Sequence, residues 1–336
     1  MDAKLARMNH LHLIIPSLFL PARASSALLA GLRLPYLEKL LARSKHLVLP
    51  PNSLEDRLCE TFGVRSVAPL RALADGLVVD DGYWLCADPV ELQIQSSQVM
   101  LQTDVACSDA DAQALCMTLN MHFGEEGLHF FAPHSRRWYV QVQTLGEVTM
   151  TPLRVAAWRD VKTLLPQGTD AQRWQRLNNE IQMLLHQHPV NTARQQAGKP
   201  VINSLWLWGG GCAATPHPVF DAVGNDDALA AAFTHASERV LLDDLPSLLT
   251  SGYERGLWVD ASLQEAWQRG DFYAYRTRLE KFENEIAAPV WQALCAGRLR
   301  TLTLEVLTEE ADHRFEMTRP GCWKLWLRRR ALTAYI

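Results

Sequence analysis

The stretch HPVNTARQQAGKPVINSLWLWGGG, residues 188–211, contains a short apolar strand at 203–208 that runs directly into Gly209, Gly210 and Gly211. In open α/β sheets, ligands collect at the carboxyl ends of the strands. Three glycines there would let backbone N–H groups approach an anion, above all if a helix N-terminus followed. The run is neither GxGxxG nor a P-loop, because no Lys-Ser/Thr follows it. A tight turn that needs positive φ explains the glycines equally well.

Polar residues just upstream extend this candidate anion site. Arg194 carries a guanidinium, which is suited to bidentate recognition of an anion. Asn191 and Asn203 lie close to it in the sequence. We therefore predict an anion-binding group made of Arg194, Asn191, Asn203 and the three glycines.

His186 and His188 have the HxH spacing found among metal ligands, because alternate side chains of a strand share a face. Pro189 follows directly, at the end of a predicted helix, and no Cys, Asp or Glu completes a ligand set nearby. Histidines in the last turn of a helix also interact favourably with its dipole. Both interpretations stay open.

Helix and strand patterns alternate along the chain on either side of this stretch. The predicted helices are 35–44, 54–62, 170–186, 228–235, 245–251 and 272–296, and the predicted strands are 11–19, 239–242, 256–260, 301–307 and 313–318. This alternation is typical of a mostly parallel sheet covered on both faces. Between them, short strands around a helix at 110–123 indicate a separate unit. We predict an α/β fold with a core domain of residues 1–82 and 151–336 and an inserted α+β domain of residues 83–150.

Composition and charge exclude several classes of protein. The chain has 336 residues, of which 48% are hydrophobic, and a net charge of -4, which argues against a surface built for nucleic acid. The apolar run 11–20 contains Pro16, is too short to span a bilayer and has no cleavage site after it. The seven cysteines show neither zinc nor disulfide spacing. We predict a cytoplasmic protein that does not bind membranes.

The stretch 188–211, above all NSLWLWGGG at 203–211, resembles the core signature of cofactor-independent phosphoglycerate mutases of the short, archaeal-type branch. That family belongs to the alkaline phosphatase superfamily, so the resemblance implies a three-layer core of that type. Weaker similarity covers most of the chain, in IIPSL (14–18), LPYLEKLLARS (34–44), the helix at 109–123 and the long helix at 270–294. The chain resembles in particular a bacterial group that carries the same run, some of whose members are labelled mutases and others regulatory proteins.

Departures from the family pattern bear on activity. The family holds two divalent metals through Asp and His and uses a Ser or Thr nucleophile, but here Ser17 follows Pro16 where the family has Asp. Asp260 matches a ligand position, although no His lies near it, and Ser53 in PPNSLEDRL is the match for the nucleophile. One Asp and one Ser cannot hold two metals. We therefore expect no bound cofactor.

Three functions follow from this reading. The preferred one is a non-catalytic, phosphoglycerate-mutase-like protein with a binding or regulatory role, which retains an anion pocket for a phosphorylated small molecule or acts on a protein partner. The alternative is an active mutase or phosphomonoesterase that uses Mn or Zn, with Ser53 as nucleophile, Asp260 and His186 or His188 as ligands and Arg194 as phosphate clamp. The third is a protein or RNA interaction module that uses the tail WKLWLRRR, residues 323–330.

Overall fold

The computed structural model describes residues 7–105, 107–225, 227–324 and 326–335. The chain forms two compact units. The first, which we call the split unit, combines Met1–Phe62 with His217–Ile336, and the second, the continuous unit, is Gly63–Pro216.

The split unit is built on a seven-stranded sheet with the order β2-β12-β11-β1-β10-β8-β9. Its strands are β1 (Met8–Pro16), β2 (Lys45–Leu49), β8 (Ala222–Asn225), β9 (Val240–Leu242), β10 (Arg255–Val259), β11 (Leu299–Leu307) and β12 (Asp312–Thr318). Strands β11, β1, β10, β8 and β9 run parallel, and β12 is antiparallel to both of its neighbours. The predicted α/β class with a mostly parallel sheet is confirmed.

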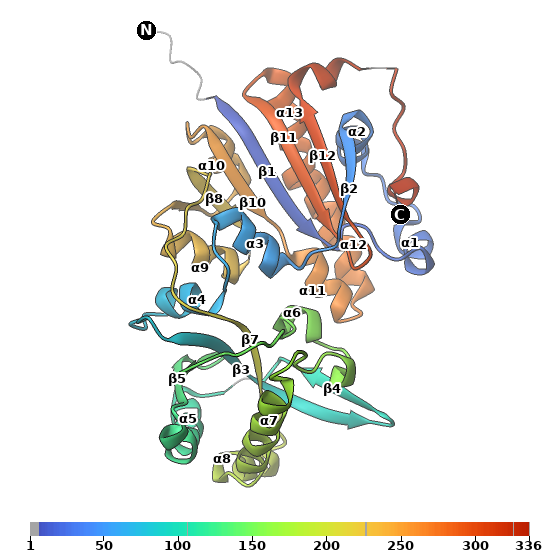
Figure 1. Ribbon diagram of the computed structural model, residues 1–336. Coiled ribbons are helices and arrows are strands. Elements are labelled where there is room, and N and C mark those ends of the chain that lie inside the picture. The colour runs from blue at the N-terminus through green and yellow to red at the C-terminus, as the bar shows by residue number, and fades with distance from the viewer. Residues whose placement is uncertain (1–6, 106, 226, 325, 336) are drawn as a thin grey trace. The chain divides into compact units, whose positions relative to one another are not determined.

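Alternation along the strands divides the sheet into an apolar and a partly polar face. Leu11, Leu13 and Ile15 of β1 pack into one core together with Leu302 and Leu304 of β11. The helices of the unit are α1 (Ala22–Leu29), α2 (Pro35–Arg43), α3 (Leu54–Phe62), α9 (Ala228–Ala236), α10 (Leu245–Thr250), α11 (Ser262–Gln268), α12 (Phe272–Phe282) and α13 (Ala288–Ala296), with short turns η4 (Arg319–Trp323) and η5 (Leu332–Tyr335). Helices α2 and α10–α13 supply the apolar core, and α12 and α13 lie behind the sheet in Figure 1.

The helix predicted at 272–296 is interrupted by a π-helical turn, η3 (Glu283–Ala287), between α12 and α13. Pro289 lies in the first turn of α13 and has no N–H to donate, so a regular helix through this point would lose a hydrogen bond. The turn places the buried carboxylate of Glu283 on the N-terminus of α2, where it accepts the N–H groups of Tyr36 (2.6 Å) and Leu37 (2.9 Å). The interruption therefore caps a neighbouring helix.

The continuous unit has an antiparallel sheet around one long strand, β3. Its strands are β3 (Tyr83–Gln95), β4 (Gln98–Gln102), β5 (His129–His134), β6 (Arg137–Val142) and β7 (Ser204–Gly211). Its helices are α4 (Ala68–Ala74), α5 (Asp109–Phe123), α6 (Leu153–Ala156), α7 (Ala171–His186) and α8 (Pro189–Gln196), with short turns η1 (Gly124–Glu126) and η2 (Val161–Thr163). Trp174, Ile181 and Leu185 of α7 share its core with Leu205 and Leu207 of β7.

Two expectations about this region are corrected. The strand predicted at 203–208 is β7, and it pairs antiparallel with β3 instead of joining the parallel sheet. A short apolar run has no feature that identifies the sheet in which it is buried. The compact unit also extends beyond the predicted insert 83–150, because α4, α7, α8 and β7 pack around the same sheet.

No helix among the described residues is both long enough and apolar enough to cross a bilayer.

Candidate functional site

The carboxyl end of the parallel sheet in the split unit is where ligands are expected. Strand β1 ends at Pro16, and Ser17 follows in the left-handed region with φ 58°. The N–H of Ser17 donates to the carbonyl of Leu307 at the end of β11 (2.9 Å). Ser17 therefore sits at the expected edge, but it offers a hydroxyl where the resemblance implies a carboxylate ligand.

Asp260 follows β10 at the same edge and is buried, at 8% exposure. One of its oxygens, Oδ1, accepts both the N–H (3.0 Å) and the hydroxyl (2.6 Å) of Ser262, the first residue of α11. Its own N–H donates to the carbonyl of Ile14 in β1 (3.0 Å). The carboxylate thus accepts the first N–H of the helix that follows, from the position before the N-cap Ala261.

Ser53 begins α3 as its N-terminal cap. The N–H of Asp56 donates to Ser53 Oγ (3.0 Å), and the Ser53 hydroxyl donates back to the Asp56 carboxylate (2.7 Å). The carbonyl of Ser53 accepts the first helical hydrogen bond, from Arg57. Ser53 is therefore a helix cap, and no histidine among the described residues hydrogen-bonds to its hydroxyl.

His186 and His188 lie in the continuous unit, whereas Asp260 lies in the split unit. His188 caps α8, where its Nδ1 accepts the N–H of Val190 (3.2 Å) and its Nε2 lies 3.0 Å from the hydroxyl of Thr118. Within the described ranges, no three His, Cys, Asp or Glu side chains are grouped so that they could hold a metal ion. The residues present do not fit the metal pair that the resemblance implies.

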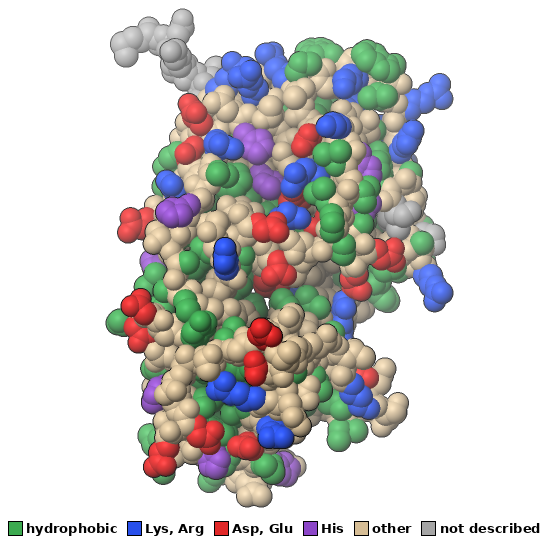
Figure 2. Space-filling model, viewed as in Figure 1, with side chains coloured by type: hydrophobic (Ala, Val, Ile, Leu, Met, Phe, Trp, Pro, Cys, Tyr) green, Lys and Arg blue, Asp and Glu red, His purple; other side chains and the backbone are tan. Residues whose placement is uncertain are grey.

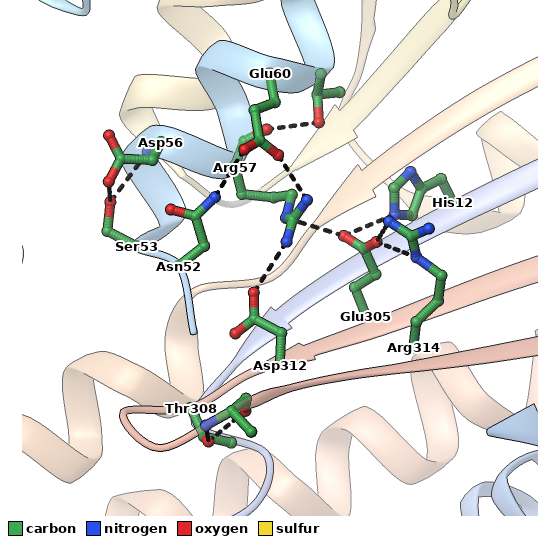
Figure 3. A network of polar contacts seen from close by, with 12 residues as sticks. His12, Asn52, Ser53, Asp56, Arg57, Glu60, Glu305, Thr308, Asp312 and Arg314 are labelled. Carbon is green, nitrogen blue, oxygen red and sulfur yellow. Dashed lines mark hydrogen bonds and ion pairs between the residues drawn. The ribbon is translucent and has the colours of Figure 1, made fainter. Parts of the chain in front are cut away.

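A cluster of charged side chains on the polar face of the split-unit sheet was not predicted. We call it the Glu305 cluster; it comprises His12, Arg57, Glu305, Asp312 and Arg314 (Figure 3). They come from β1, α3, β11 and β12, and strand register places Glu305 beside Arg314. Glu305 and Asp312 are almost completely buried.

Glu305 is surrounded by three basic side chains. Its Oε1 accepts from Arg314 Nε at 2.6 Å, and its Oε2 lies 3.3 Å from His12 Nε2 and 3.4 Å from Arg57 Nε. Burial alone would raise the pKa of Glu305, but these basic groups outweigh it and lower the pKa to about 2.

Arg57 also links the cluster to Asp312 and to the surface. Its Nη2 donates to Asp312 Oδ2 at 3.0 Å, and its Nη1 donates to the exposed Glu60 at 2.6 Å. For Asp312, burial outweighs the hydrogen bond and charge of Arg57, so the pKa of this carboxyl is raised. Two carboxylates near the carboxyl end of the sheet are thus neutralised by guanidinium groups, which leaves them poorly suited to bind cations.

One sequence feature could have revealed this cluster. Glu305 is the only charged residue in TLTLEVL, residues 301–307, and such a strand is buried on at least one face. A lone carboxylate in it requires a buried cationic partner. Which arginine supplies that charge depends on tertiary contacts between residues about 250 positions apart, such as Arg57 and Glu305.

The predicted anion site lies in the continuous unit, and its polar side chains have intramolecular partners. Asn191 donates to the carbonyls of Leu185 and Ile202 (both 2.7 Å), while Asn203 pairs with both backbone groups of Leu92 in β3. Arg194 is buried, and its Nε donates to the carbonyl of Pro200 (2.8 Å). These contacts hold the α8–β7 connection in place. The anion pocket itself stays a prediction.

The three glycines end β7 and are followed by residues 212–216 without a helix, so the expected helix N-terminus is absent from this described segment. Gly209 adopts positive φ (64°) and its carbonyl accepts the N–H of Val67 (3.1 Å). A Cβ on Gly211 would lie 2.5 Å from the Cβ of Ser66. Close packing against the segment before α4 accounts for these two positions.

The second tryptophan of the WLWG run, Trp208, belongs to a buried polar network. Asp88 of β3 accepts a bidentate pair from Arg71 of α4 (2.6 and 2.9 Å) and a third hydrogen bond from the Trp208 indole (2.8 Å). The Arg71 guanidinium also lies over the rings of Trp208 and Tyr139. The Tyr139 hydroxyl donates to Asp75 at 2.6 Å. Trp208 therefore holds a carboxylate and a guanidinium inside the continuous unit.

No family model matches the chain. In sequence it is similar to the 2,3-bisphosphoglycerate-independent phosphoglycerate mutases of Methanosarcina barkeri (29% identity over 150 residues) and Methanosarcina mazei (31% over 153 residues). Each match covers 44% of this chain and 37% of the relative, so the chain spans well under half the length of these relatives.

Two solved structures resemble the whole chain. A Pyrococcus horikoshii protein matches with a TM-score of 0.58 and 13% identity, over 93% of this chain and 88% of the other. The cofactor-independent phosphoglycerate mutase of Thermoplasma acidophilum matches with a TM-score of 0.50 and 11% identity, over 97% and 94%. At these identities the likeness shows the fold alone. In part of its sequence and in its fold, the chain is thus similar to cofactor-independent phosphoglycerate mutases.

Proposed function

We propose that the chain is a non-catalytic, phosphoglycerate-mutase-like protein with a binding or regulatory role. The observation that carries the proposal is the arrangement at the carboxyl end of the parallel sheet. There Ser17 stands where the resemblance implies a ligand, and Oδ1 of Asp260 is hydrogen-bonded to Ser262 at the start of α11. A pair of divalent ions needs several carboxylate or imidazole donors that converge on one point.

The Glu305 cluster supports the same proposal. Its two buried carboxylates are near that edge of the sheet, but arginines neutralise them. A metal ion placed there would have to displace guanidinium groups that already satisfy much of the negative charge. Charge balance in this region is thus met by the protein itself.

The decisive test is metal content together with activity. We expect freshly purified protein to contain far less than one manganese or zinc per chain by elemental mass spectrometry. We also expect no turnover of 3-phosphoglycerate or p-nitrophenyl phosphate with added manganese. About two metals per chain with turnover would overturn the proposal and establish the alternative, an active mutase or phosphomonoesterase, which the sequence similarity to named mutases favours.

Two variants separate structural from catalytic roles. Ser53→Ala removes the cap of α3 and should lower stability by about 1 kcal/mol without changing any ligand binding. Asp260→Asn keeps an acceptor for Ser262 and should leave metal content unchanged. Loss of turnover in Ser53→Ala, or loss of bound metal in Asp260→Asn, would show that these residues act as nucleophile and ligand.

The cytoplasm remains the proposed location. All seven cysteines are free thiols in the structure, which is what a reducing compartment maintains.

A further inference from the structure

The segment that begins at the last residue of η4 carries an unusual surface. We call it the C-terminal loop and define it by Trp323, Lys324, Trp326, Leu327 and Arg328–Arg330; Leu325 lies outside the described residues. Trp323 is 65% exposed and Trp326 is 75% exposed. The other nine tryptophans of the chain are buried or half-buried.

Contacts within the split unit hold the loop at both ends. Before it, Gly321 and Cys322 are buried, and the carbonyl of Cys322 accepts from Arg43 of α2 (2.6 Å). After it, Leu332 is buried and the ring of Tyr335 stacks on Phe19 with 6.0 Å between centroids. A loop anchored in this way loses less conformational freedom when it binds a partner.

Exposed indoles beside guanidinium groups are the side chains that most often dominate binding energy at protein interfaces. Single exposed apolar residues are common on protein surfaces. Here, however, two tryptophans lie within four residues of each other and Leu327 is next to them, with 36% of its surface exposed. The loop therefore offers an exposed apolar anchor with cations next to it in the sequence.

The charge of the loop is of one sign. It carries Lys324 and Arg328–Arg330, and the sequence contains no Asp or Glu from residue 319 to the end. Lys and Arg side chains project from the edge of the molecule where this loop runs (Figure 2). Burial raises the pKa of Glu38, and the positive charge of Arg329 opposes this rise. The other three cations, Lys324, Arg328 and Arg330, form no ion pair with any described carboxylate.

We propose that the C-terminal loop binds an acidic peptide segment of a partner protein that also carries apolar side chains. The tryptophans would cover the apolar side chains and the cations would pair with its carboxylates. The whole chain carries a net charge of -4, which opposes approach to an extended polyanion or an anionic bilayer. A short peptide presents its charge to the loop alone, within a Debye length of about 8 Å.

The test uses the full-length protein and a fluorescein-labelled peptide of alternating glutamate and leucine, with alternating lysine and leucine as its control. We expect saturable binding of the acidic peptide by fluorescence anisotropy, with a shift in tryptophan emission and weaker binding at higher salt. The double variant Trp323→Ala/Trp326→Ala should weaken binding about tenfold or more, and Arg328→Gln/Arg330→Gln should weaken it and flatten the salt dependence. The matched control Arg136→Gln/Lys199→Gln removes two cations from the continuous unit and should bind as the parent does.

Several outcomes would overturn the proposal. These are no binding of the acidic peptide, equal binding of the lysine peptide, or unchanged binding by both loop variants. Tighter binding of polyuridylate or of phosphatidylglycerol vesicles would instead assign the loop to RNA or to a membrane. Because both tryptophans are exposed, the loop variants should keep the parent's thermal midpoint, so that lost binding is not lost folding.

Discussion

Two buried carboxylates, Asp88 in the continuous unit and Glu305 in the split unit, need partners for their charge and find them in different ways. Both oxygens of Asp88 are hydrogen-bonded, by one dedicated arginine and an indole. Glu305 shares three basic neighbours, and its Oε2 is buried with contacts at 3.3 and 3.4 Å but no hydrogen bond. The first arrangement is complete and depends on a single cation. The second leaves one oxygen without a hydrogen bond, but two basic neighbours remain if any one of the three is removed.

The largest effect is expected where the arrangement depends on one cation. Arg71→Met leaves Asp88 charged and buried without its partner, which should lower the free energy of unfolding by about 3–5 kcal/mol. Urea unfolding followed by tryptophan fluorescence measures this. The double variant Arg71→Met/Asp88→Leu removes both charges of this pair, so it should regain part of the stability lost in Arg71→Met. If the double variant were no more stable than the single one, an unpaired charge would not be the cause.

A smaller loss is expected from Arg57→Met, because Glu305 keeps Arg314 and His12. We expect about 1–3 kcal/mol from the same urea experiment, mostly through Asp312. The control is Glu60→Gln, which removes the exposed partner of Arg57 and should change stability by no more than about 0.5 kcal/mol. Equal losses in the two variants would mean that the buried carboxylates contribute nothing to the role of Arg57.

The smallest expected difference between the two carboxylate sites is in how stability depends on pH. His10, beside the Glu305 cluster on β1, has its pKa lowered to about 4 by burial, with His12 and Arg255 adding to the effect. The unfolded chain takes up this proton near pH 6.5, so stability should fall between pH 6.5 and pH 4. Replacing His10 by Gln should make the thermal midpoint less dependent on pH in that window. Glu305 affects stability at lower pH. Because its pKa is lowered to about 2 in the folded protein, it contributes stability that is present above about pH 4.3 and is lost as the pH falls toward 2.

Parallel curves for the parent and the His10→Gln variant between pH 6.5 and pH 4 would contradict this assignment. A variant of the Asp88 site, Trp208→Phe, provides the matched comparison. It removes one hydrogen bond to Asp88 without touching a histidine, and should lower the midpoint by the same amount throughout that window.

Local sequence patterns predicted most elements of the fold but not how distant elements pair. The helices predicted at 35–44 and 54–62 agree closely with α2 and α3, because apolar spacing and a proline in the first turn of α2 are local features of the sequence. The short strands β2 and β8 and the helix α4 lack a clear period and were missed. The strand predicted at 203–208 exists as β7 but was assigned to the wrong sheet, because its partner is the distant strand β3.

The candidate site was harder to predict than the fold. Side chains chosen for their chemistry, such as Arg194, Asn191 and Asn203, turned out to have backbone partners that fix local structure. The charges that gather near the sheet edge come from α3, β11 and β12, far apart in the sequence. Residue type indicates what a side chain can do, whereas its tertiary neighbours decide whether it is free to do it.

The split of the first unit along the chain has a consequence for synthesis. Strand β1 finds its partners β10 and β11 only near the other end of the chain, whereas the continuous unit is made of consecutive residues. On the ribosome, Gly63–Pro216 can therefore complete its sheet first, while β1 emerges early and stays unpaired until β10 and β11 have been made. An apolar strand in that position is exposed to aggregation and to chaperones until the last third of the polypeptide has been made.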